Sequence, residues 1–490
     1  MAATNPPCPQ GSGQSNQGES AVSDGQPVQP PLEFIPVHYR PWVVHSSYAL
    51  LPVVLRLRLQ PWLPAGIGPV TCSNPEVLAD YFHRFQASEL RLLLAFRHSQ
   101  VDDPLCLSYL FSRLIPRAAR RHGISLKPPI HSFFMYDRGM PLWAGRWLGW
   151  FFSSMGGIPV RRGRRLDLKS LKAVRHYLVN GPFPVTIAPE GATNGHGEVI
   201  SPLEPGTAQV AFWAVEDLHQ AQRSQQVLVL PVGLQYFYPQ PDWAALDRLL
   251  GRLEQDCGLA VPPWEDPRQK SAQDYGHRLL TLGHHLLTQM EGFYQRLYGP
   301  LPAADQGSDR LQTLLHQALV VGEAYFKLPS TGSLETRCRR LEEAGWTHIY
   351  REDLATGPHQ GCPFDQGLAN WMATAAALQV RPMRLVESFV AVRDSYVQGQ
   401  PSFERLAETS LILFDLVERV KGTRVPRRPQ LGRRQAVISL ADAINVSQRW
   451  STYQPSRQAA KAAVDQLTQD LQAALEGLIL PTGSPPGGLG

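Results

Sequence analysis

The stretch LLLAFRHSQVDDPLC, residues 92–106, changes character along its length. Its first five residues are apolar or small, and the positions that follow bring a histidine, two aspartates and a proline close together. Charged side chains are costly to bury, so the stretch is typical of an inner strand that ends at a surface or cleft. The sequence therefore predicts a buried strand whose end presents His98 and Asp103.

Similar apolar runs recur further along the chain and alternate with helical patterns. RLLLAF (91–96), FPVTIA (183–188) and QVLVLPVGL (226–234) are strand-like, whereas GTAQVAFWAVEDLHQA (206–221) is helix-like. This alternation predicts an α/β domain over residues 31–240, with a largely parallel sheet flanked by helices.

The pattern changes beyond residue 240, where long helical segments predominate. Apolar residues spaced by three and four form one stripe that ends before Gly299 and Pro300. Further helix-like segments lie at about 308–327, 367–397, 402–421 and 457–479. Residues 241–480 are therefore expected to form a mostly helical region, in which the basic, proline-broken stretch 419–434 is a loop.

Composition limits the class of protein. A chain of 490 residues is long enough for two domains, each with a sizeable core. Its ends, residues 1–30 and 481–490, are rich in Pro, Gly and small polar residues and are expected to be a disordered and a flexible tail. The net charge of +5 is modest for this length and gives no reason to expect a nucleic-acid partner.

The six cysteines lie far apart, with no CxxC pair and no secretory leader, which indicates reduced thiols in a cytosolic setting. One local cluster consists of Cys338, His348, His359 and Cys362, but its spacing matches no common zinc site. The favoured interpretation is core cysteines and surface histidines. We expect no metal and no bound cofactor.

No apolar run reaches the ~18 residues that a membrane-spanning helix requires. Two aromatic- and arginine-containing regions, near 38–63 and 141–155, have the composition of segments that lie in a membrane interface. The alternative is that their tryptophans fill a core, since tryptophan is used heavily in both settings. On the first interpretation the protein attaches to the cytoplasmic face of a membrane as a peripheral or monotopic protein.

His98 and Asp103 admit two interpretations. Asp103 precedes Pro104 and a helix-like run, so its carboxylate could serve only as a helix N-cap. A carboxylate at that place could also accept the Nδ1 proton of a histidine at the preceding strand end. That pairing fixes one tautomer and leaves Nε2 to take a proton from an attacking hydroxyl.

Two further stretches favour chemistry. GGIPVRRGRR (156–165) offers glycines that let the backbone approach a ligand, followed by four arginines suited to phosphate. IAPEGATNGHGE (187–198) leaves a strand through Pro-Glu-Gly into a loop of small residues. Such a turn can present backbone N–H groups to an oxyanion or a phosphate.

Taken in order, these motifs resemble those of the PlsC-like glycerolipid acyltransferase family, which includes the 1-acylglycerol-3-phosphate acyltransferases. The family's marks are H-x4-D, G-x-I-x-x-x-R, P-E-G and an apolar strand that ends in P-V. Here they stand as His98 to Asp103, Gly156 to Arg162, Pro189 to Gly191, and Val229 to Val232. The resemblance covers about residues 90–236.

The resemblance implies a membrane-associated enzyme that moves a fatty acyl group from a coenzyme A or acyl carrier protein thioester to a glycerolipid hydroxyl, with lysophosphatidate as a candidate acceptor. It implies His98 as the base, oriented by Asp103. By position, Gly157 and Arg162 would contact phosphate, and Glu190 and Gly191 would shape the acceptor site.

Two departures from the family pattern bear on the acceptor. Arg97 stands where an asparagine is frequent, and Thr193 stands where the family has an arginine. The second departure argues against lysophosphatidate as acceptor. Two other classes of function remain open: a non-catalytic lipid-binding or interaction protein, and a hydrolase that uses the same pair to cleave acyl thioesters with water.

Overall fold

The computed structural model describes residues 27–30, 32, 34–57, 66–141, 145, 147–160, 168–261, 271–300, 310–351, 362–389, 394–399, 401–423 and 426–481. The chain divides into two compact units. The larger unit comprises residues 34–161, 165–297 and 388–490, and the smaller comprises 1–33, 162–164 and 298–387. Most of both predicted tails, residues 1–26 and 482–490, lies outside the described residues.

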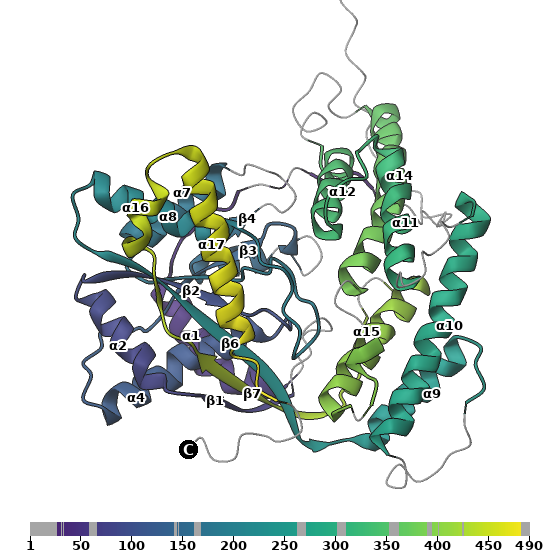
Figure 1. Cartoon of the computed structure of the whole chain (residues 1–490), viewed down its shortest axis with the longest axis horizontal. Coiled ribbons are helices and arrows are strands. Elements are labelled where there is room, and N and C mark those ends of the chain that lie inside the picture. Colours follow the sequence, from purple (N-terminus) through teal and green to yellow (C-terminus); the bar gives the residue numbers. More distant parts are fainter. Residues whose placement is uncertain are drawn as a thin grey trace, which may run out of the picture. The chain divides into compact units, whose positions relative to one another are not determined.

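The larger unit is built on one eight-stranded sheet (Figure 1). Its strands are β1 (Ile67–Cys72), β2 (Leu90–Phe96), β3 (Phe133–Asp137), β4 (Gly157–Val160), β5 (Val185–Ile187), β6 (Gln226–Pro241), β7 (Gly432–Leu440) and β8 (Ile444–Asn445). They are ordered β1-β7-β6-β2-β5-β3-β4, and β8 pairs with β6. The five strands from β6 to β4 in this order run parallel, so the predicted α/β fold with a largely parallel sheet is confirmed.

Helices cover both faces of this sheet. Those from the first half of the chain are α1 (Pro41–Arg56), α2 (Pro75–Gln86), α3 (Asp103–Tyr109), the π-helical turn η1 (Leu110–Leu114), α4 (Ile115–Arg121), α6 (Trp147–Ser154), α7 (Leu168–Asn180) and α8 (Gly206–Gln220). The second half of the chain contains α9 (Trp243–Asp256), α10 (Ala272–Tyr298), η2 (Asp394–Tyr396), α15 (Phe403–Val420), η3 (Ser447–Arg449), α16 (Trp450–Tyr453) and α17 (Arg457–Glu476). Of these, α17 packs on the sheet beside α8, whereas α9 packs against α15.

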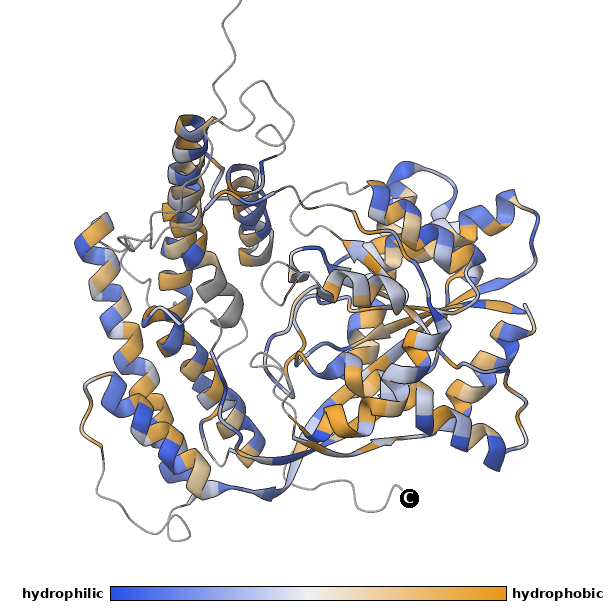
Figure 2. Cartoon of the chain, turned by 180° about the vertical axis from the view of Figure 1, so that it is seen from behind, coloured by the Kyte–Doolittle hydropathy of each residue, from blue (hydrophilic) through white to orange (hydrophobic). Residues whose placement is uncertain are grey.

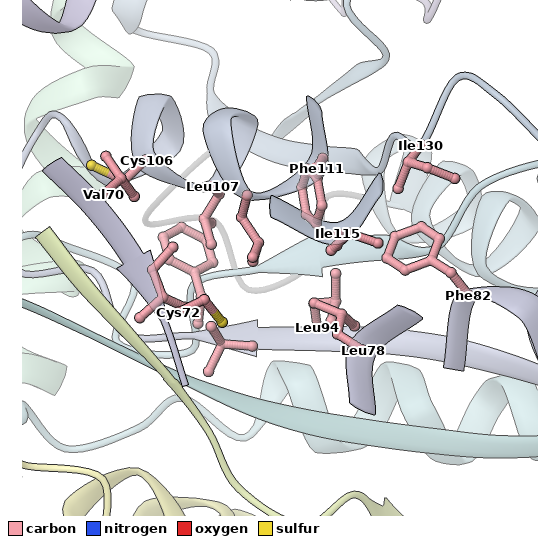
Figure 3. Close-up of a cluster of buried hydrophobic side chains, with 14 of the residues drawn as sticks. Val70, Cys72, Leu78, Phe82, Leu94, Cys106, Leu107, Phe111, Ile115 and Ile130 are labelled. Carbon is pink, nitrogen blue, oxygen red and sulfur yellow. The ribbon is translucent and has the colours of Figure 1, made fainter. Parts of the chain in front are cut away.

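Alternate residues of the central strands supply the two cores. In β2, Leu92 and Leu94 belong to the core beneath α2, α3 and α4, whereas Leu93 belongs to the core beneath α7, α8 and α17. Figure 3 shows the first of these cores, where Leu94 lies among side chains of the surrounding helices. Every residue of β2 is buried, as the apolar run 92–96 predicts, and burial extends to Arg91 near the start of the strand. The central strands are hydrophobic in Figure 2.

The smaller unit is helical. It contains α11 (Arg310–Tyr325), α12 (Leu334–Ile349) and most of α14 (Pro363–Phe389). Arg337 of α12 forms a buried fork-like ion pair with Glu323 of α11, with N–O distances of 2.8 Å. The helical character predicted for the C-terminal half is confirmed; the boundary near residue 240 stays a prediction.

Strand β7 contradicts the loop predicted from the sequence. The stretch 419–434 was expected to be a loop, but β7 begins at Gly432 and inserts between β1 and β6. It runs parallel to β1 and antiparallel to β6. Its apolar residues Val437 and Ile438 are buried because the strand lies inside the sheet. The second half of the chain therefore contributes directly to the sheet that carries the site.

No helix within the described part of the chain is long and apolar enough to cross a bilayer. Helix α1 is instead two-sided: Val43, Val44, Tyr48, Leu51 and Leu55 are buried, whereas Trp42, Leu50, Val53 and Leu57, which follows the helix, are exposed. On α6, Trp147 and Trp150 are also exposed. Trp143, Trp62 and Arg146 of the predicted interfacial regions lie outside the described residues.

Candidate active site

Parallel strands bring the sequence motifs to one edge of the sheet. Ala95 of β2 lies opposite Ile187 of β5, so the segments that follow both strands emerge side by side. Strands β3 and β4 end at the same edge, where Asp137 lies opposite Val160. Ligand sites of open α/β sheets form at this carboxyl edge.

His98 and Asp103 are in contact. His98 Nδ1 lies 3.0 Å from Asp103 Oδ2, and the side chains are 22% and 0% exposed respectively. A buried carboxylate thus meets a histidine that reaches solvent. With Nδ1–H donated to the carboxylate, Nε2 is the ring nitrogen that carries a lone pair.

The carboxylate of Asp103 has two further hydrogen-bond donors. The main-chain N–H of Gln100 donates to Oδ2 at 2.9 Å, and the hydroxyl of Tyr236 donates to Oδ1 at 2.6 Å. Asp103 is the first residue of α3, and the N–H that it accepts belongs to the loop before the helix. The interpretation of Asp103 as only an N-cap is therefore wrong.

Tyr236 was not among the predicted site residues. It is buried on β6, beyond the point where this strand pairs with β2. Burial, and then the nearby carboxylate of Asp103, raise the pKa of Tyr236 well above its usual value, so its hydroxyl stays protonated and donates. The only feature of the sequence that could have indicated this tyrosine is the apolar strand on which it lies.

Glu190 lies beneath His98 and is nearly fully buried. Its Oε1 accepts the main-chain N–H of His98 at 2.9 Å, and its Oε2 accepts the N–H of Ser201 at 2.9 Å. Burial raises the pKa of Glu190, and these two hydrogen bonds oppose the rise. Glu190 therefore fixes the backbone at His98. Because its side chain is nearly fully buried, it presents little surface to a ligand.

The two glycines meet different demands. Gly191 has a φ of +72°, and a Cβ there would lie 2.1 Å from Glu204 Oε1, so the turn after Glu190 requires glycine. Gly157 lies on β4, separated from β2 by β5 and β3, and a Cβ there would lie 2.9 Å from the carbonyl oxygen of Phe152. Arg162 lies outside the described residues.

Arg97 is an internal side chain, only 1% exposed. Its guanidinium donates to the carbonyls of His196 and Val199, both at 2.8 Å, and to that of Gly197. It therefore holds the loop after the Pro-Glu-Gly turn against the end of β2. This contact accounts for the arginine that replaces the family's asparagine.

The same loop is tied to α15 from its other side. The carboxylate of Glu408 accepts the hydroxyl of Tyr396 at 2.7 Å and the N–H of Gly197. Glu198 pairs with Arg405, with Arg405 Nε at 3.1 Å from Oε2. The loop of residues 194–199 is thus fixed between β2 and the second half of the chain.

His196, at the centre of this loop, is fully buried, and neither ring nitrogen has a partner among the described residues. Burial, together with the charges of Arg97 and Arg428, lowers its pKa from 6.5 to about 4. As the pH falls through 6.5, His196 becomes protonated in the unfolded chain, whereas in the folded chain it stays neutral until about pH 4. This group therefore lowers the free energy of unfolding across that window, by up to about 3 kcal/mol.

We expect His196→Phe to be less sensitive to acid than the wild type, because phenylalanine keeps the ring and loses only unpartnered nitrogens. The measurement is the melting temperature of both proteins from pH 7.5 to 4.5. Burial raises the pKa of Glu408 to about 7, so this carboxyl makes the fold more stable as the pH falls, the opposite of His196. Both proteins contain Glu408, so its effect cancels when their melting temperatures are compared. Identical acid sensitivity would contradict this assignment.

No group of three or more metal-ligating side chains occurs among the described residues. Of the cysteine and histidine cluster predicted to be non-metallic, Cys338 is buried and His348 stacks on Phe326 at 5.7 Å, whereas His359 lies outside the described residues.

His98, Asp103 and Glu190 thus lie together at one edge of the parallel sheet. Residues 70–235 match the family model described as Acyltransferase. Over this region the resemblance to the PlsC-type glycerolipid acyltransferase family that the motifs suggested is confirmed. No curated protein matches the chain. Tyr236 lies just beyond the matched region, and β7 lies far beyond it.

Proposed function

We propose that the protein transfers a fatty acyl group from a thioester, carried by coenzyme A or acyl carrier protein, to a hydroxyl of a glycerolipid. His98 is the general base in this proposal, and Asp103 orients it. The observation that supports it best is the 3.0 Å contact between a partly exposed histidine and a fully buried carboxylate.

The proposed chemistry needs no metal and no covalent enzyme intermediate. Nε2 of His98 accepts the proton of the acceptor hydroxyl as its oxygen attacks the thioester carbonyl. The tetrahedral intermediate then collapses, the C–S bond breaks, and the departing thiolate recovers the proton from the imidazolium. Asp103 stabilises the transient positive charge on the ring.

The release of free thiol from acyl-CoA tests this proposal against its two alternatives. Transfer predicts that purified protein releases thiol only when a lipid acceptor is present. Release at the same rate without acceptor would indicate a hydrolase. No release with any carrier and acceptor would indicate a non-catalytic lipid-binding protein.

We further propose that the outer faces of α1 and α6 attach the protein to a membrane. The rings of Trp42 and Trp150 lie 6.2 Å apart, and the guanidinium carbon of Arg40 lies 5.4 Å from the centre of the Trp150 ring. Exposed tryptophans beside an arginine suit the boundary between lipid tails and headgroups.

If so, wild-type protein should sediment with vesicles, and Trp42→Ala/Trp150→Ala should sediment much less while keeping its melting temperature. The matched control is Phe364→Ala/Trp371→Ala, which removes two exposed aromatics from α14. Unchanged sedimentation of the α1 and α6 variant would contradict the proposed attachment surface.

Thr193 bears on the acceptor. It is exposed and stands where the family has an arginine, so a phosphomonoester acceptor lacks one charge-assisted hydrogen bond here. Such a bond is worth roughly 1.5 to 3 kcal/mol, or about ten- to a hundredfold in binding. We propose that the acceptor is less charged than lysophosphatidate, or that Arg162 and its neighbours Arg161, Arg164 and Arg165 have taken over the contact.

Thr193→Arg separates these two possibilities. Improved activity on lysophosphatidate would support the less charged natural acceptor, and Ser451→Arg, on exposed α16, controls for added surface charge. Strong wild-type activity on lysophosphatidate that collapses in Arg162→Ala would support the arginine cluster. Good use of lysophosphatidate without dependence on any of the four arginines would contradict this account.

A further inference from the structure

The aspartate before the proposed orienting residue is also buried. Asp102 is 0% exposed, and one of its carboxylate oxygens forms an ion pair with Arg434 of β7. Removal of a carboxylate from water is costly unless a charge compensates it. Two adjacent buried carboxylates, Asp102 and Asp103, therefore depend on separate partners.

The register of β7 brings Arg434 to this place. Its main-chain N–H donates to the carbonyl of Gly66 at 3.0 Å, next to β1. On the other side of β7, Ala436 lies opposite Tyr236 of β6. Residues two apart on a strand share a face, so Arg434 reaches across the same face of the sheet as Tyr236.

Arg434 accordingly contacts Tyr236 as well. Its guanidinium carbon lies 4.9 Å from the centre of the Tyr236 ring, and the hydroxyl of that ring donates to Asp103 Oδ1 at 2.6 Å. One guanidinium thus touches both the neighbour of Asp103 in the chain and the side chain that holds Asp103.

We propose that Arg434 is a positioning residue for the His98–Asp103 pair, and that the C-terminal half of the chain completes the active site through it. Arg434 fixes Asp102 at the start of α3 and fixes the ring of Tyr236. Together these hold the Asp103 carboxylate with one oxygen on His98 and the other on Tyr236. The inference rests on the proposed function of His98.

The charge states agree with this arrangement. Burial alone would lower the pKa of Arg434, but the adjacent carboxylate of Asp102 raises it, so the guanidinium stays charged. Burial raises the pKa of Asp102, and Arg434 offsets part of that rise. The charge of Arg428 also lowers the pKa of Asp102, but its effect is smaller than that of the direct ion pair with Arg434.

The test uses full-length protein and compares kcat with KM for Tyr236→Phe, Arg434→Lys and the double variant Asp102→Asn/Arg434→Met. The double variant removes both charges together, so no buried carboxylate is left uncompensated. The matched control is Arg278→Met, which breaks partly buried ion pairs of α10 with Glu254 and Asp247 of α9. Circular dichroism and melting temperature report folding.

We expect kcat to fall roughly tenfold or more in Tyr236→Phe and in the double variant. Each variant loses about one interaction, comparable to a hydrogen bond, that positions the Asp103 carboxylate. KM should change by less than about threefold, because both side chains are buried away from solvent. Arg434→Lys, which keeps the charge without the planar fork, should give an intermediate kcat. Arg278→Met should retain the wild-type kcat.

Wild-type kcat in a folded double variant would overturn the inference, since Arg434 would then serve only to neutralise Asp102. Wild-type kcat in Tyr236→Phe would overturn it as well. His98→Ala separates this failure from that of the proposed function. An inactive His98→Ala beside active Tyr236→Phe refutes the positioning role alone, whereas an active His98→Ala refutes the base itself.

Discussion

His98→Ala is expected to lower acyl transfer by roughly 10² to 10⁴, and by more if no other group can accept the acceptor's proton. The ring is the proposed base and its side chain reaches solvent, so its loss removes proton transfer without opening the core. The fold should persist because Glu190 binds the main-chain N–H of residue 98, which alanine retains. The measurement is kcat of purified protein at saturating thioester and acceptor.

The matched control is His285→Ala on α10, where Nε2 of the ring lies 3.0 Å from the carbonyl oxygen of Cys257. It should turn over at the wild-type rate and melt close to the wild type. Near-wild-type turnover in folded His98→Ala would exclude His98 as the base.

Asp103→Asn is expected to show the second largest effect, a fall on the order of 10 to 10³ in kcat and smaller than that of His98→Ala. All three partners of the carboxylate donate to it: His98 Nδ1, the N–H of Gln100 and the hydroxyl of Tyr236. An amide in that place must turn its NH2 toward at least one donor. The ring then loses its fixed tautomer or the carboxamide loses a hydrogen bond.

The expected signature is a lower kcat with a nearly unchanged KM, since Asp103 is fully buried and does not reach substrate. Asp247→Asn on α9, which alters an ion pair with Arg278 of α10, serves as a matched change elsewhere in the larger unit. An Asp103→Asn enzyme as fast as the wild type would show that orientation of His98 by a carboxylate is unnecessary.

The local part of the site could be predicted from sequence. A strand ends just before His98 and a helix starts at Asp103. His98 and Asp103 are five positions apart in the chain, so short-range geometry alone brings them into contact. The glycine at 191 could also be anticipated, since the turn after Glu190 needs a left-handed backbone. These features depend on neighbours in the chain, which periodicity and turn chemistry describe well.

The remaining contacts depend on strand order, which sequence patterns do not define. Tyr236 meets Asp103 from a strand 133 positions away, and Arg434 reaches Asp102 only because β7 inserts between β1 and β6. The basic stretch before β7 resembles a solvated loop, so the strand that follows it was missed. The charge of Arg97 likewise suggests an exposed side chain, whereas its two terminal guanidinium nitrogens donate to three carbonyls of a distant loop in the interior.

The most direct test of the central claim follows the label of a radioactive acyl thioester. Purified full-length protein is incubated with it and with vesicles that contain a lysoglycerolipid, beside the His98→Ala variant. We predict that the label appears in a diacyl lipid with the wild type and not with the variant. Label recovered only as free fatty acid, or equal lipid labelling by both proteins, would contradict base-catalysed acyl transfer by His98.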